Sequence, residues 1–101
     1  MDVVQAIGKV RFASARPQRV HVSRNGACAV ELLCMEAGQE AKVTAGPWTY
    51  YVVMGAARIA AGRRAERIAA GEAAVTGPDE VHTLANAGEG RLVCLAVGPS
   101  G

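Results

Sequence analysis

The segment from residue 71 to residue 86 reads GEAAVTGPDEVHTLAN and carries His82, one of two histidines in the chain. An imidazole can bind a metal ion or transfer a proton near neutral pH, so His82 is the side chain best suited to chemistry. Asn86 follows four residues later, and we expect it to shape the turn after its strand. The second histidine, His21, alternates with valines in RVHV and is expected to face solvent. The chemistry of His82 therefore depends on what the fold brings to it.

Short apolar segments separated by turn residues are the dominant pattern around His82. Such a pattern is typical of an all-β sandwich or small barrel. The stretch 56–74 is rich in Ala, Arg and Glu, which favour helix, but Gly55, Gly62 and Gly71 interrupt it, so hairpins are predicted there. The expected strands are 19–22, 27–35, 49–54, 56–60, 71–75, 81–85 and 91–97.

Alternation assigns faces to the segment 27–35. If Glu31 points to solvent, the neighbouring Val30, Leu32 and Cys34 point inward, and Leu33 and Met35 lie on the outer face. Apolar side chains on an outer face of a small domain are best explained by a second layer or a partner subunit. The sequence therefore predicts a homodimer. Tyr51, Val53 and Gly55 belong to the outer face of their own strand and are further candidates for dimer or hairpin contacts.

Composition excludes several classes of function. The 101 residues, half of them hydrophobic, predict one folded domain spanning 1–101. A net charge of +2 and four aromatic residues do not favour nucleic-acid binding. The longest uncharged stretch, 43–57, is too short to span a bilayer, and the N-terminus does not resemble a signal peptide. We therefore expect a cytoplasmic protein without a nucleic-acid or membrane partner, whose three cysteines are buried free thiols.

The spacing within 71–86 resembles the second conserved motif of the cupin superfamily. That motif is Gly, five residues, Pro, one residue, Gly, two residues, His, three residues, Asn. Gly71, His82 and Asn86 match it in identity and spacing, while Gly77 and Asp79 stand where Pro and Gly are usual. Both replacements suit a tight turn.

Upstream segments resemble the first motif region of the same family. LLCMEAGQE, WTYYVVMGAARIAAG and the closing strand RLVCLAV extend the resemblance over residues 27–97, with an N-terminal strand segment in 1–26. The resemblance implies an all-β fold, the cupin double-stranded β-helix, which is a jelly-roll-like small barrel. It would also imply a metal site, if the first motif supplied its usual two histidines and glutamate.

Those ligands are missing from the first motif. Counting back from Gly55, their positions hold Lys42, Thr44 and Trp48, and counting forward from the turn near residue 38 reaches Thr44 and Gly46 instead. An ammonium, a hydroxyl and an indole do not make a transition-metal site with one histidine. We therefore predict no metal and no cofactor. A site built from Cys34, His82 and a tyrosine stays open as the alternative.

Without a metal, His82 is predicted to line a pocket for a small organic ligand of unknown identity. Its expected companions are Trp48, Tyr50, Thr44 and Lys42, which together offer aromatic walls and a few polar groups. The alternative is that the aromatic rings fill the space and His82 is a satisfied core residue. A metal-independent epimerase or isomerase with His82 as base and Tyr50 as acid is a second functional hypothesis. A metal-dependent dioxygenase or isomerase is a third, and the missing ligands favour it least.

Overall fold

The computed structural model describes residues 1–44 and 46–100, and strands dominate it. The predicted all-β class is confirmed. A short 3₁₀ helix, η1 (Ile7–Lys9), lies in the N-terminal segment. The strands that follow are β1 (Gln18–Asn25), β2 (Cys28–Met35), β3 (Glu40–Val43), β4 (Thr49–Met54), β5 (Ala56–Ala61), β6 (Arg64–Ala69), β7 (Ala73–Val75), β8 (His82–Asn86) and β9 (Leu92–Pro99).

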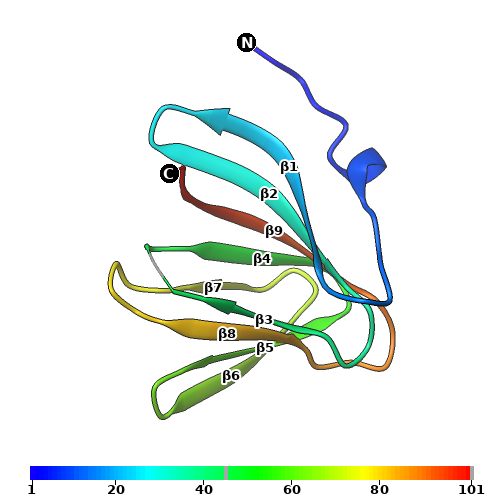
Figure 1. The fold of residues 1–101 in the computed structure, drawn as a ribbon, viewed down its shortest axis with the longest axis vertical. Helices are drawn as coiled ribbons and strands as arrows, with labels where there is room; N and C mark the ends of the chain where they lie inside the picture. Colours follow the sequence, from blue (N-terminus) through cyan, green and yellow to red (C-terminus); the bar gives the residue numbers. More distant parts are fainter. Residues whose placement is uncertain (45, 101) are drawn as a thin grey trace.

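The strands form two antiparallel sheets. A five-stranded sheet has the order β1-β2-β9-β4-β7, and a four-stranded sheet has the order β3-β8-β5-β6. Strands that are neighbours in a sheet are often distant in the chain, as β2 and β9 are, which is the connectivity of a jelly roll. Figure 1 shows β1, β2 and β9 in the upper part of the barrel and β8, β5 and β6 in the lower part, with the N-terminal segment beside β1.

The alanine-rich stretch forms a hairpin, as its glycines predict. Strand β5 pairs with β6 from Ala56 opposite Ala69 to Ala61 opposite Arg64, and Gly62 supplies a positive φ of 58° in the turn between them. Gly55, just before β5, has a φ of 86°, and a Cβ there would lie 2.4 Å from the backbone oxygen of Arg91. Glycine is therefore needed at both ends of β5.

The main core lies between the sheets, and it corrects the predicted faces of β2. Leu33 and Met35 are fully buried in this core with Tyr50, Leu84 and Leu92. The expectation that Leu33 and Met35 lie outside is wrong, and the homodimer argument that used them loses its basis. Side chains of both parities on β2 are buried, so the position of one charged residue could not decide which face points inward.

A second, smaller cluster covers the outer face of the five-stranded sheet. Leu32, Cys34 and Val93 are buried there, and Val10 and Phe12 of the N-terminal segment pack against them. Valines of the neighbouring strand β1, in the same sheet, pack at their side. The chain thus supplies its own second layer over part of this face. The buried side chains of Leu32 and Cys34 belong to this layer instead of the barrel interior.

Two further expectations have mixed outcomes. Cys34 and Cys94 are buried free thiols as predicted, but Cys28 is exposed, because it lies at the end of β2 next to a turn. His21 is exposed as expected. Within the part of the chain that is described, no helix has the length and apolar character needed to cross a membrane.

Candidate functional site

His82 opens β8 and lies inside the barrel with 1% of its surface exposed. Both ring nitrogens have partners: Nδ1 is 2.9 Å from the backbone oxygen of Glu80, and Nε2 is 2.6 Å from Tyr50 Oη. A carbonyl oxygen can only accept a hydrogen bond, so Nδ1 carries the proton of the neutral ring, and Nε2 accepts one from the Tyr50 hydroxyl. His82 is therefore a fully satisfied buried histidine.

Tyr50 comes from β4, across the barrel from His82. Burial raises the pKa of the Tyr50 hydroxyl well above its usual range, because the phenolate would lose its hydration inside the core. The ring also contacts His82 edge-on at 5.4 Å between centroids, and stacks beside Trp48 at 6.1 Å. Three aromatic side chains thus form a continuous buried row.

Trp48 covers the end of this row and is 7% exposed. Its ring lies so close to Gly98 that a Cβ at that position would be 2.4 Å from two indole carbons. The Trp48 backbone is held by Thr76, whose hydroxyl accepts from the Trp48 amide at 3.0 Å and whose own amide donates to the Trp48 carbonyl at 2.9 Å. Trp48 therefore closes the barrel on this side.

Arg19 lies over Trp48 and is paired with Glu31, and neither was among the predicted site residues. The Arg19 guanidinium carbon is 5.4 Å from the centroid of the Trp48 ring, a cation–π geometry. Arg19 Nη1 lies 3.2 Å from Glu31 Oε1, close enough for an ion pair, although the two groups are not aligned for a hydrogen bond. The expectation that Glu31 points to solvent is therefore wrong, since Glu31 shares the inward face of Leu33. In the register of β1 against β2, His21 is the residue opposite Glu31, and Arg19 lies diagonally across from it, opposite Leu33. The sequence alone gives no signal for this diagonal pair.

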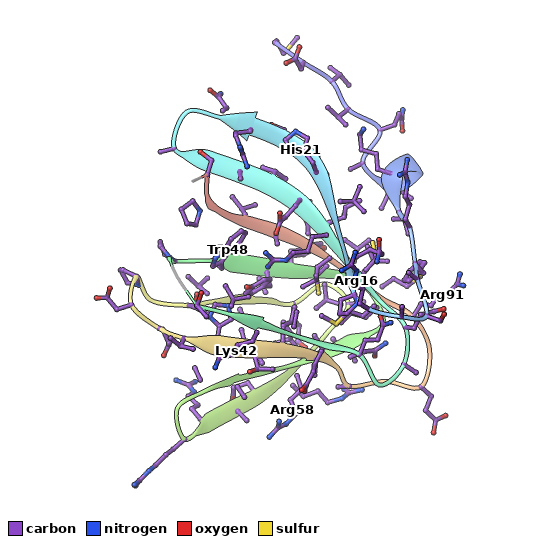
Figure 2. All side chains as sticks on the ribbon, viewed as in Figure 1. Arg16, His21, Lys42, Trp48, Arg58 and Arg91 are labelled. Carbon is purple, nitrogen blue, oxygen red and sulfur yellow. The ribbon has the colours of Figure 1, made fainter. Side chains whose placement is uncertain are left out.

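Lys42 and Thr44 do not join the row. Val43, and not Lys42, is the residue that pairs with His82 across β3 and β8. Lys42 lies opposite Thr83 on the other face of the sheet and is exposed, as is Thr44. Figure 2 shows Lys42 with β3 and β8, and Trp48 beside the start of β4. The prediction that Lys42 and Thr44 face the same interior as Trp48, Tyr50 and His82 is therefore wrong. Val43 holds the inward position opposite His82, so the residues on either side of Val43 do not face the interior.

The residues around His82 do not fit a metal ion. Its neighbours are valine and aromatic side chains, and both of its nitrogens are engaged in hydrogen bonds. Across residues 1–44 and 46–100, no three His, Cys, Asp or Glu side chains gather as a ligand set. Cys34, the alternative ligand, belongs to the cluster on the far side of the five-stranded sheet. No step through a metal follows from this donor set.

Asn86 shapes the turn after β8, as predicted. Its side-chain nitrogen donates to the backbone oxygens of Gly90 at 2.7 Å and of Met35 at 3.3 Å, and its side-chain oxygen accepts from the amide of Gly88 at 2.9 Å. The amide side chain therefore connects the turn to the end of β2. These bonds explain why a buried asparagine stands at this spacing from His82.

A cleft of about 440 Å³ opens between the β5–β6 hairpin and β7. Ile59 and Ile68, both core residues, and Ala74 form its apolar floor. Arg64 and Glu66 lie on its rim and share the face of β6 that carries Ile68. Ala61 of β5 and Arg67 of β6 also line the cleft. The remaining lining residues come from the segments around β7 and β8: Glu72, Ala73, Val75, Thr76 and Glu80. No sequence signal pointed to this cleft, because it depends on how the edges of the two sheets approach each other.

Solved structures with the same fold cover nearly the whole chain. A protein from Thermus thermophilus superposes with a TM-score of 0.90 at 20% identity, covering 98% of this chain and 97% of that one. An uncharacterised conserved protein with a double-stranded β-helix domain from Klebsiella pneumoniae gives 0.86 at 24% identity, with coverages of 98% and 90%. A cupin superfamily protein from Desulfitobacterium hafniense gives 0.79 at 14%, with coverages of 91% and 84%.

Sequence comparison adds nothing to these structural likenesses. No protein-family model matches the chain, and neither does a curated protein. At such identities a structural likeness speaks for the architecture and leaves the chemistry open. The connectivity of the two sheets and the superpositions agree with each other and with the resemblance of residues 27–97. The chain therefore has the cupin fold, a double-stranded β-helix.

Proposed function

We propose that the chain is a metal-independent barrel that binds a small organic molecule in the cleft between the β5–β6 hairpin and β7. The observation that carries this proposal is the contrast between a barrel centre filled by its own aromatic row and an open cleft of about 440 Å³ beside it. Small-molecule sites are commonly concave, of about 300–1,000 Å³, with an apolar lining and a few polar groups. The cleft has these properties.

The rim suggests what kind of ligand would fit. Among the residues that the structure describes, neither Arg64 nor Glu66 forms an ion pair with another side chain. The carboxylates of Glu72 and Glu80 are turned to backbone amides, at 2.8 Å from Ala69 N and 3.2 Å from Gly77 N. A ligand with a carboxylate for Arg64, a hydroxyl or amine for Glu66 and an apolar body for the floor would match this arrangement.

The cleft also contacts the elements that hold the aromatic row. Thr76 lines the cleft and hydrogen-bonds the backbone of Trp48, and Glu80 lines it and accepts from His82 Nδ1 through its backbone oxygen. Trp48 is the single tryptophan of the chain. Ligand binding in the cleft should therefore change tryptophan fluorescence without any contact between ligand and indole.

A thermal-shift and calorimetric screen of small carboxylates, sugars and aromatic compounds tests the proposal. We expect a binder whose affinity is lost in Ala61→Phe, which fills the cleft, and is weakened in Arg64→Gln. Arg58→Gln is the matched control, since Arg58 is exposed on the opposite face of β5 (Figure 2). The absence of any binder at millimolar concentration, or a binder that tolerates Ala61→Phe, contradicts the proposal.

A metal-independent enzyme is the second candidate, and one observation favours it. The 2.6 Å contact between Tyr50 Oη and His82 Nε2 joins a hydroxyl to a base in the geometry of a proton relay. The burial of Tyr50 argues against this candidate, because Tyr50 is 0% exposed and a substrate would have to displace Trp48 to reach it. Turnover of any cleft ligand that disappears in Tyr50→Phe while binding persists would support this candidate, and turnover that persists in Tyr50→Phe would contradict it.

The homodimer is also part of the proposed function. The predicted contact surface around Leu33 and Met35 is internal, but Tyr51 and Val53 remain exposed on the outer face of β4. We propose that the chain pairs through that side of the barrel. Sedimentation velocity over a range of concentrations tests whether a dimer forms.

A further inference from the structure

The cleft beside the β5–β6 hairpin lies between two free sheet edges. Strand β6 ends the four-stranded sheet and strand β7 ends the five-stranded sheet, so each has one side that no described strand pairs. A short turn joins them, in which the Glu72 amide donates to the Ala69 carbonyl at 2.9 Å. In Figure 1 the two strands run apart from this turn, β6 with β5 and β7 with β4. The cleft occupies the angle between them.

The hydrogen bonds of β7 identify the main-chain groups that face the cleft. Glu72 and Thr76 bond the chain of β4 and the residue before it, at 3.0 and 2.9 Å. In an antiparallel ladder, residues that face the partner strand alternate with residues that face away. Ala73 and Val75 therefore direct their N–H and C=O away from β4. Because Ala74 packs toward the core, the side chains of Ala73 and Val75 lie on the other face, and their main chain borders the cleft.

The β6 wall of the cleft carries main-chain groups of the same kind. Ala69 N bonds the Glu72 side chain at 2.8 Å, so Ala69 faces away from β5, and alternation gives Arg67 the same orientation. Arg67 lines the cleft with Arg64 and Glu66, and all three are exposed. The cleft thus combines unpaired main-chain donors and acceptors on both walls with charges of both signs.

We propose that the ligands of this cleft are short peptides with free ends, bound in extended form along the edge of β7. This inference rests on the proposed function and names the ligand class of the same site. An extended peptide supplies N–H and C=O groups at the spacing of a strand, and its main chain can therefore bond Ala73 and Val75 as an added strand does. A sugar or an aliphatic acid leaves these groups to water.

A tripeptide matches the other features of the cleft. Three extended residues span about 10 Å, and β7 itself has three residues. The middle residue lies beside Ala74, so its side chain points toward the floor of Ile59 and Ile68, where an apolar side chain fits. The amine and the carboxylate at the two ends are the groups that Glu66 and Arg64 can bind. The first and third side chains lie on the outer face, so many sequences should bind.

Matched ligands separate main-chain pairing from charge. By calorimetry, we expect the tripeptide Ala-Leu-Ala to bind, and its analogue methylated on both amide nitrogens to bind at least tenfold more weakly, because its N–H groups are lost. ω-Aminooctanoate is the matched control, since it has the same number of atoms between amine and carboxylate but no amide. We expect it also to bind at least tenfold more weakly than the tripeptide. Equal affinity of the three compounds would overturn the peptide assignment.

Proline variants test the same pairing from the side of the protein. Val75→Pro removes an N–H that faces the cleft without removing a bond to β4, and proline is tolerated at such edge positions. We expect it to weaken tripeptide binding at least tenfold with an unchanged circular dichroism spectrum, while Val75→Ala, which keeps the N–H, binds as wild type. Ala65→Pro is a second control, because Ala65 is exposed on the edge of β6 but outside the cleft lining. Wild-type affinity in Val75→Pro overturns the pairing.

The outcomes distinguish this inference from the proposed function. If a non-peptide ligand binds and is lost in Ala61→Phe while no tripeptide binds, the cleft remains a ligand site and the peptide class is wrong. If no compound of either kind binds at millimolar concentration, both proposals are wrong. Tripeptide binding that survives Ala61→Phe places the peptide outside the cleft and overturns this inference.

Discussion

Replacing Tyr50 with phenylalanine probes the buried hydrogen bond at the centre of the barrel. The ring, its packing against Trp48 and its volume are retained, and only the hydroxyl that lies 2.6 Å from His82 Nε2 is lost. Nε2 then has no donor at a position where His82 is 1% exposed. An unsatisfied buried acceptor costs about 1–3 kcal/mol. With an m-value of about 2 kcal/mol/M, the urea midpoint of unfolding should fall by about 1 M.

A double-mutant cycle separates the hydrogen bond from other effects. His82→Leu alone leaves the Tyr50 hydroxyl without its acceptor, whereas Tyr50→Phe combined with His82→Leu removes both partners. We expect the double variant to be more stable than the sum of the single effects by about 1 kcal/mol or more. Tyr51→Phe is the matched control, because that hydroxyl belongs to an exposed residue of the same strand. All variants are compared at one protein concentration, since the proposed dimerisation would add to apparent stability.

Two results would refute the reasoning. One is a Tyr50→Phe variant within about 0.5 kcal/mol of wild type, the ordinary range for surface changes, with no coupling in the cycle. The other is an imidazole ¹⁵N spectrum in which neutral His82 carries its proton on Nε2. The bond from Nδ1 to the carbonyl of Glu80, at 2.9 Å, requires the opposite tautomer.

Three other predictions follow from the same core. Gly98→Ala should destabilise the fold by about 1–3 kcal/mol, since its Cβ would lie 2.4 Å from Trp48, while Gly90→Ala, with no atom within 4 Å, should be nearly neutral in urea denaturation. Burial raises the pKa of the Cys94 thiol from 9.0 to about 12. The stabilising contribution of the neutral thiol is therefore complete below pH 9, and the free energy of unfolding should fall by up to about 1.4 kcal/mol per pH unit as the pH rises from 9 to 12. Cys94→Val should flatten that slope in thermal melts, and an unchanged slope would contradict the assignment. Added Zn²⁺, Ni²⁺ or Mn²⁺ should barely move the melting temperature, and a rise of several degrees abolished by His82→Ala would show that a metal site forms.

The strands and turns could be predicted from the sequence because local signals determine them. Gly55 and Gly62 adopt positive φ values at the ends of β5, and such glycines are visible as letters in the sequence. The motif that contains Gly71, His82 and Asn86 identified the architecture for a related reason. Asn86 binds three backbone groups around its turn, so its spacing from His82 reflects local geometry.

The faces of β2 could not be predicted, since they depend on segments far away in the chain. Leu32 is covered by the N-terminal segment and Leu33 by the opposite sheet, so both neighbours are buried and alternation carries no information. Glu31 does not mark a wet face. It lies on the inward side, where Arg19, diagonally across on β1, provides a charge partner.

The candidate site could be predicted in part. Trp48 and Tyr50 lie in one row with His82, since Trp48 directly precedes β4 and residues two apart in extended chain share a face. Counting along the motif places Lys42 with them, but the register of β3 against β8 puts Val43 opposite His82. A shift of one residue reverses every side chain of a strand, and the short loop before β4 hides that shift from the sequence pattern.

The filled centre supports placing the proposed ligand in the cleft at the edge of the barrel. A buried imidazole costs several kcal/mol unless both nitrogens are bonded, and in this chain Tyr50 and the Glu80 carbonyl supply both bonds. A ligand that entered the centre would have to replace the Tyr50 hydroxyl and displace Trp48 from its place over Gly98. At the cleft, Arg64 and Glu66 are exposed and no bond of the fold has to break. The proposed binding there would therefore start from solvated side chains, and the aromatic row can serve stability alone.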